Sequence, residues 1–277
     1  MKYYPGNMKH SCFFLLIVWF TPGCNVQDNA TPCESLSAPI PCEWAIEETA
    51  YMNMPRPADS YNFTICPGTE EWVVRTPAEA YQIPDCVLKK MSTQAVIQAV
   101  LEWPHNLSHA LYNVTYGDEY SFETDAWILG LNSRTELLKR KDAGKALLER
   151  LSLMEPVTFY QSQWLEWLFG HSVFLSRLNN NQKRQTVEIC LKNDDLRLRD
   201  TIYSNIFRST TFVLIGRTML ADNYAPIMRG MKNDEELRFF IDGSKIKDGR
   251  KIYYSYFIND SLIQWIIELA KNYINQQ

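Results

Sequence analysis

The sequence is poor in glycine and lacks an excess of positive charge. Glycine accounts for 11 of 277 residues, about 4% against a usual value near 7%, which disfavours a glycine-rich sandwich or barrel. The formal net charge is −4, so the chain does not have the basic footprint that nucleic-acid binding requires. With 46% hydrophobic and 22% charged residues, the composition is that of a globular protein and excludes a disordered one.

The common catalytic signatures are also missing. The sequence contains no G-x-G-x-x-G, no Walker P-loop, no G-x-S-x-G, no H-E-x-x-H and no C-x-x-C. No cofactor is therefore expected. The absences favour a non-catalytic protein, although they leave the presence of an activity open.

One histidine pair could bind a metal ion. His105 and His109 are four residues apart, and this spacing points two imidazoles along one face of a helix, as in many zinc sites. Glu102 and His171 could complete such a site if the fold brought them near. The alternative is a pair of surface or interface histidines at a helix start, because no third ligand follows from the spacing.

Aromatic and acidic residues each allow a functional and a structural interpretation. Trp164, Trp167 and Phe169 could stack on sugar rings if they were exposed, but at helical spacing they are expected in the core. Carboxylates need a defined separation across a cleft to act as an acid/base pair, and at helix starts they are explained by the helix dipole. The carboxylates concerned are Asp194, Asp195, Asp200, Asp234, Glu235 and Glu236.

The first 23 residues have the features of a secretory signal peptide. Lys9 supplies a positive charge, and Cys12–Phe20 is an apolar run of nine residues, too short to span a bilayer as a helix. Phe-Thr-Pro-Gly-Cys at its end resembles a bacterial lipobox, with Thr21 where leucine is usual. We therefore expect lipidation at Cys24 and export to a membrane-anchored position; ordinary cleavage near Gly23 is the alternative.

Export would allow disulfides to persist. Beyond Cys24 the chain has five cysteines, an odd number that cannot pair completely within one chain. Four of them lie in the amino-terminal third, and we expect the pairs Cys33–Cys42 and Cys66–Cys86. The fifth, Cys190, falls in a helical pattern and is expected to be a buried thiol.

The remainder divides into a Pro-rich tether, residues 24–65, and a helical domain, residues 66–277. Pro84 suits a first helical turn, and Ser92 can cap a helix that runs to Trp103. The pattern over 133–151 predicts one amphipathic helix with Lys139, Arg140, Lys141 and Lys145 in solvent. Further helices are expected over 158–178, 182–192, 195–207 and 209–221.

Two capping boxes and one turn are predicted near the carboxyl end. Asn233 with Glu236, and Ser261 with Gln264, have the spacing of capping boxes. Residues 247–250 read Lys-Asp-Gly-Arg and could form the turn of one short β-hairpin. Successive amphipathic helices with short connections predict an all-α fold, built as an antiparallel helix stack or an irregular α-solenoid.

Two stretches resemble a family of proteins whose function is uncharacterised. They are Ile83–Pro104, beginning Ile-Pro-Asp-Cys-Val-Leu-Lys-Lys-Met-Ser-Thr, and Leu137–Leu148, which reads Leu-Leu-Lys-Arg-Lys-Asp-Ala-Gly-Lys-Ala-Leu-Leu. Both are similar to exported, lipoprotein-like helical proteins from gut bacteria, and the resemblance covers about residues 66–155. It implies an all-helical, repeat-like body and brings no activity or binding residues with it.

Three functions are compatible with these features. The first is a non-catalytic envelope protein, lipid-anchored through Cys24, that presents a helical surface to protein or peptide partners. The second is a periplasmic or surface hydrolase of peptide or glycan that uses a metal at His105 and His109. The third is a carbohydrate-binding lipoprotein in which Trp164 and Trp167 contact the sugar.

Overall fold

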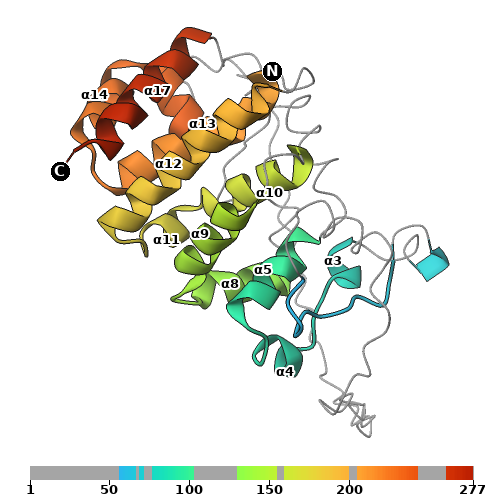
Figure 1. The fold of residues 1–277 in the computed structure, drawn as a ribbon. Coiled ribbons are helices and arrows are strands. Elements are labelled where there is room, and N and C mark those ends of the chain that lie inside the picture. The colour runs from blue at the N-terminus through green and yellow to red at the C-terminus, as the bar shows by residue number, and fades with distance from the viewer. Residues whose placement is uncertain are drawn as a thin grey trace, which may run out of the picture. The chain divides into compact units, whose positions relative to one another are not determined.

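A computed structural model describes residues 56–66, 69–71, 77–102, 130–154, 159–199, 205–242 and 260–276. In these ranges all regular structure is helical, which confirms the all-α prediction (Figure 1). The predicted hairpin at 247–250 and the signal peptide, with Cys24, lie outside the described residues. None of the described helices is both long and apolar enough to cross a membrane.

The helices are numbered as in Figure 1. Their bounds are α3 Pro77–Ala80, α4 Asp85–Leu88, α5 Thr93–Leu101, α8 Asn132–Lys139, α9 Ala143–Leu153, α10 Phe159–Phe169, α11 Ser172–Leu175, α12 Asn180–Arg197, α13 Asn205–Ala221, α14 Ala225–Asn233, α15 Glu235–Asp242 and α17 Asp260–Ile274.

The first helices begin where their capping residues predict. Pro84 occupies the N-cap position of α4, and the Ser92 side chain caps α5 by accepting a hydrogen bond from Ala95 N. The Ser92 hydroxyl in turn donates to Asp59, at 3.0 Å. The cap is therefore fixed from both sides.

The prediction of a single helix over 133–151 is wrong. The chain forms two helices there, α8 and α9, and the turn between them begins at Arg140. The backbone of Arg140 is extended, with ψ of 121°. Its guanidinium donates to Met91 O at 2.5 Å and to Leu88 O at 2.9 Å. Its side chain is only 13% exposed, so the expectation that it lies in solvent is also wrong, whereas Lys139 and Lys141 are exposed.

A second arginine repeats this arrangement one helix pair further on. Arg177, between α11 and α12, donates to Arg140 O and Leu138 O, both at 2.6 Å. Each arginine thus lies in the turn of one helix pair and binds carbonyls at the turn of the preceding pair. We call Arg140 and Arg177 the arginine ladder. It stacks the pairs α4–α5, α8–α9 and α11–α12 in the manner of a helical repeat, although the sequence shows no clean period.

Residues 56–66 pack against the helices, although the sequence placed most of them in the tether. Arg56 forms an ion pair with Glu102 at 2.6 Å and also donates to Tyr61 O. Phe63 is buried, and its ring lies 4.2 Å from that of Tyr81. Residues 56–66 are therefore part of the helical body.

Helices α12 and α13 are antiparallel neighbours. Lys183, near the start of α12, donates to Ala221 O at the end of α13, whereas Asp194, near the end of α12, pairs with Arg208 near the start of α13. Helix α17 contacts both. This group of helices forms the frame on which the candidate site is built.

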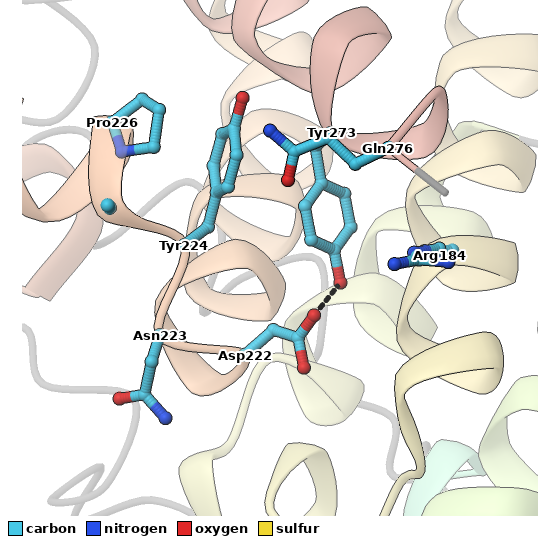
Figure 2. Close-up of a pocket in the computed structure, with 8 residues that line it drawn as sticks. Arg184, Asp222, Asn223, Tyr224, Pro226, Tyr273 and Gln276 are labelled. Carbon is cyan, nitrogen blue, oxygen red and sulfur yellow. Dashed lines mark hydrogen bonds between the residues drawn. The ribbon is translucent and has the colours of Figure 1, made fainter.

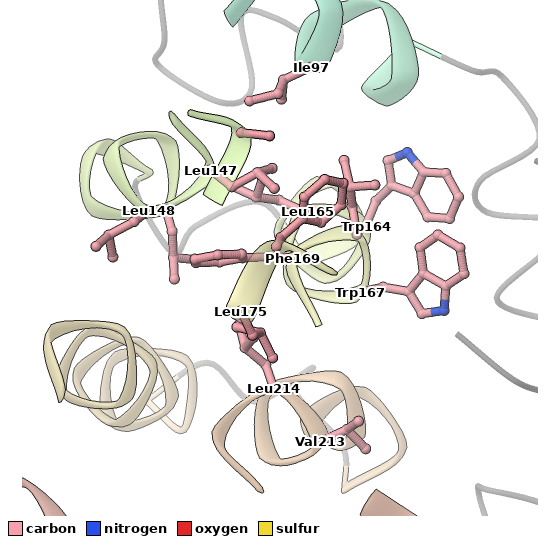
Figure 3. Close-up of a cluster of buried hydrophobic side chains, with 14 of the residues drawn as sticks. Ile97, Leu147, Leu148, Trp164, Leu165, Trp167, Phe169, Leu175, Val213 and Leu214 are labelled. Atoms are coloured by element: carbon pink, nitrogen blue, oxygen red, sulfur yellow. The ribbon is translucent and has the colours of Figure 1, made fainter. Parts of the chain in front are cut away.

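The hydrophobic core runs through the stacked helices. Figure 3 shows side chains from α5, α9, α10, α11 and α13 converging, with Leu165 and Phe169 among them. Both residues are fully buried. Trp164 and Trp167 belong to the same cluster; their rings stack 4.6 Å apart at an interplanar angle of 5°, and Trp164 Nε1 donates to Val100 O. These tryptophans are therefore core residues in the structure, as their helical spacing predicted.

Candidate functional site

The site with the most chemical content is a pocket of about 210 Å³ beside the junction of α13 and α14 (Figure 2). Three segments form its wall: α12, the turn between α13 and α14, and the end of α17. The lining residues are Arg184, Asp222, Asn223, Tyr224, Ala225, Pro226, Tyr273 and Gln276. Because the pocket is smaller than the roughly 300–1,000 Å³ that encloses a drug-sized ligand, it suits a small molecule or one terminal group of a larger one.

The turn that forms one side of the pocket is determined by local sequence. Asn223 has φ of 55°, in the left-handed region that asparagine tolerates better than most residues. Tyr224 N donates to Met219 O and Asn223 N to Leu220 O, which is the pattern of hydrogen bonds that ends a helix with a left-handed residue. Pro226 then lies in the first turn of α14, where its missing N–H costs nothing.

Asp222 holds the three segments together. One carboxylate oxygen accepts from the Tyr273 hydroxyl at 2.8 Å, and the other pairs with Lys183 Nζ at 3.2 Å. The side chains of the ion pair are 9% and 11% exposed, so solvent screens the interaction less than on an open surface. The negative charge of Asp222 is consequently offset within the wall itself.

Two tyrosines give the pocket its aromatic surface. The rings of Tyr224 and Tyr273 meet edge to face, with centroids 5.2 Å apart, and both side chains are buried. Burial raises the pKa of the Tyr273 hydroxyl, and the hydrogen bond to Asp222 raises it further, while Arg184 acts in the opposite direction. Burial also raises the pKa of Tyr224. Both phenols therefore remain protonated at neutral pH.

Arg184 is the one lining residue whose charge is not matched in the described part of the chain. Its Nε is buried and has no hydrogen-bond partner. No other described residue forms a hydrogen bond or ion pair with its guanidinium. Figure 2 shows Arg184 directed toward the Tyr273 hydroxyl. A guanidinium presents a planar fork of donors that matches a carboxylate, so this side chain is suited to accept an anion.

The histidine and glutamate residues proposed from sequence as metal ligands have other roles where they are described. His171 Nδ1 accepts from Val173 N and so caps α11. Glu102 is buried and binds Arg56 and Gln98. His105 and His109 lie outside the described residues. Within the described ranges, no three His, Cys, Asp or Glu side chains gather in a metal-binding group.

Three cysteines lie among the described residues, and they are of two kinds, disulfide-bonded and free. Cys66 and Cys86 are each disulfide-bonded, and the pairing of one with the other stays a prediction. Cys24, Cys33 and Cys42 lie outside the described residues. Cys190 is free and fully buried, which confirms the expectation of a buried thiol. Its burial raises the pKa of the thiol well above the usual value, and Glu166 and Asp194 add to this, so it is not a reactive nucleophile.

Two buried ion pairs give Asp194 and Glu166 a structural role, which differs for Asp194 from the helix-start interpretation of the sequence. Asp194 is not at a helix start but in α12, where it pairs with Arg208 at 2.6 Å. Glu166 of α10 pairs with Arg197 at 2.8 Å and accepts from the Thr211 hydroxyl. Because each carboxylate is held by a buried arginine, these groups join α10, α12 and α13.

Sequence reasoning did not find the pocket. Arg184 stands among polar residues at the start of a helix and has no local mark that distinguishes it from a solvated side chain. The segment Asp222–Pro226 does carry the signature of one helix ending and another beginning, which could have placed the turn. What brings Tyr273 to that turn is contact between segments about fifty residues apart, and no local pattern encodes it.

Comparison of the chain with protein-family models, with curated proteins and with solved structures finds no match.

Proposed function

We propose that the chain is a non-catalytic envelope protein, lipid-anchored through Cys24, whose helical body binds a ligand in the pocket between α12, α13 and α17. The observation that carries the binding part is Arg184, a residue of the pocket wall whose guanidinium has no hydrogen-bond acceptor among the described residues and whose Nε is buried. Leaving a buried charged donor unsatisfied costs more than a hydrogen bond gains. Such a side chain in a pocket is therefore best explained by a ligand that supplies the acceptor.

The proposed lack of catalysis is supported by how the polar groups are used. Asp222, Glu166, Asp194 and Glu102 each bind an arginine, a lysine or a tyrosine, and Cys190 is buried. A general acid or base has to face the reacting group, and in the described part of the chain these carboxylates face protein partners. The stacked helix pairs, joined by the arginine ladder, are suited to serve as a rigid support for the pocket.

The anchor and the binding function can be tested together by native mass spectrometry. Full-length protein is recovered from bacterial membranes and compared with a Cys24→Ala variant. We expect a lipid adduct at the amino terminus that the variant lacks, and a second, non-covalent mass that both proteins retain. An unmodified chain in the soluble fraction would contradict the anchor. Turnover of peptide or glycan substrates by the purified protein would contradict a non-catalytic function.

A further inference from the structure

We propose that the pocket binds a small monocarboxylate, with the carboxylate on the guanidinium of Arg184 and the rest of the molecule against Tyr224 and Pro226. This inference rests on the proposed binding function and names its ligand class. The argument uses three properties of the pocket, namely its charge, its lining and its size.

The charge of the pocket favours an anion with one negative charge. Lys183 and Asp222 form an ion pair in the wall, so they cancel one another. Arg184 then leaves one positive charge without a partner among the described residues. A monocarboxylate balances that charge, whereas a phosphate dianion would bring an excess negative charge close to Asp222.

The geometry of Arg184 favours a carboxylate among monoanions. A guanidinium can donate two parallel hydrogen bonds to the two oxygens of a carboxylate, and such bidentate pairs are stronger than single neutral hydrogen bonds. The Tyr273 hydroxyl does not take the place of that anion, because it is neutral, it donates to Asp222, and among the described residues no hydrogen bond joins it to the guanidinium of Arg184. The fork of Arg184 is thus the group that fixes the anionic end of the ligand.

The remaining lining predicts the body of the ligand. Tyr224 and Pro226 offer an apolar surface, and the exposed amides of Asn223 and Gln276 offer both donors and acceptors at the rim. A molecule with hydroxyl or amide groups beside its carboxylate could pack on the apolar surface and also form hydrogen bonds with the amides at the rim. At about 210 Å³, the pocket has room for one sugar acid or one acylated amino acid rather than a larger ligand.

The test is isothermal titration calorimetry on the full-length protein in detergent, with three matched probes. Glucuronate presents a carboxylate on a sugar, N-acetylalanine presents one on an amino acid, and glucose has the sugar ring without the charge. We expect glucuronate or N-acetylalanine to bind and glucose not to bind. The tighter-binding of the two carboxylates shows whether the carboxylate of the ligand belongs to a sugar acid or to an acylated amino acid.

Variants of the arginine test whether the carboxylate lies where we place it. Arg184→Met should weaken binding by about 10- to 100-fold, since a hydrogen bond to a charged group is lost. The affinity of Arg184→Lys should lie between those of the wild type and Arg184→Met, because lysine keeps the positive charge but cannot donate two parallel hydrogen bonds from a planar fork. Arg199→Met is the control, since it removes an exposed charge beyond the other end of α12. Circular dichroism and urea unfolding should show all three variants folded.

The possible results separate this inference from the proposed function. Equal binding of glucose, competition by inorganic phosphate, or an unchanged affinity in Arg184→Met would overturn the carboxylate. Failure of both carboxylates to bind at millimolar concentration would overturn it as well. If a non-covalent mass nevertheless persisted in the native spectrum of the wild-type protein and disappeared in Arg184→Met, the binding function would stand with a different ligand.

Discussion

The contact between α13 and α15 allows a sharp test of the packing. Gly216 of α13 faces Ile241 of α15, and a Cβ added to Gly216 would overlap Ile241 Cδ1 and lie 3.1 Å from Ile241 Cγ1. Ile241 is fully buried, so in a closely packed interior its side chain has no free space into which it could rotate. Gly216→Ala should therefore destabilise the protein, although alanine is the better helix former.

The magnitude follows from two opposing effects. Overpacking a core costs about 1–3 kcal/mol, and replacing glycine by alanine inside a helix returns about 1 kcal/mol. The net loss expected for Gly216→Ala is about 1 kcal/mol. Ile241→Val alone should cost about 1 kcal/mol, since it removes one buried methyl group. In the double variant the valine lacks the atom that overlaps, so the net change should be close to zero and the coupling about 2 kcal/mol.

The assay is urea unfolding followed by circular dichroism for the wild type, both single variants and the double variant. The comparison is valid if all four share the same m-value, because the free energies then refer to the same transition. We expect the double variant to be more stable than Gly216→Ala. If the two changes add to within about 0.5 kcal/mol, the close contact between Gly216 and Ile241 does not exist and the reasoning fails.

Three other predictions follow from contacts described above. Gly144→Ala should lower the free energy of unfolding by about 2 kcal/mol in urea, because the new Cβ would lie 2.5 Å from the backbone oxygen of Phe174; stability equal to wild type would contradict this packing. The raised pKa of Tyr273 means that the folded protein holds this proton more tightly than the unfolded chain. The contribution of this proton to the free energy of unfolding is therefore full below about pH 10 and is lost as the pH rises above that value. The stability of Tyr273→Phe at alkaline pH should consequently depend less steeply on pH than that of the wild type, and an unchanged dependence would refute this. Glu166→Leu should cost about 3–5 kcal/mol because it leaves the charge of Arg197 buried without this carboxylate; the double variant with Arg197→Met should regain much of this in thermal melts, and no recovery would count against the pair.

The sequence predicted helices well where local chemistry determines them. Ser92 caps α5 as its spacing indicates, and α15, Glu235–Asp242, forms close to the predicted capping box of Asn233 and Glu236. Its cap, however, is Asp234, whose side chain accepts from Leu237 N, rather than Asn233. Asn233 and Asp234 are adjacent, and either side chain can accept such a hydrogen bond, so the local sequence does not determine which of them caps the helix.

Features that depend on distant contacts could not be predicted. The pattern over 133–151 is continuous, yet the chain turns at Arg140 because carbonyls 49 and 52 residues earlier accept from its side chain. Helix α14 was missed, since its short apolar stripe is meaningful only once Ile227 and Met231 have a core to enter. The pocket is of the same kind, because Arg184 and Tyr273 come from separate helices.

The arginine ladder also gives the fold a direction of assembly. The carbonyls of Leu88 and Met91 must wait for Arg140, and the carbonyl of Arg140 must wait for Arg177, which follows it by 37 residues. Each turn is thus completed by a residue that the ribosome adds later. As the chain emerges, Arg140 completes the turn of the first pair and Arg177 completes the turn of the second. The stack can therefore build from its amino-terminal pair onward.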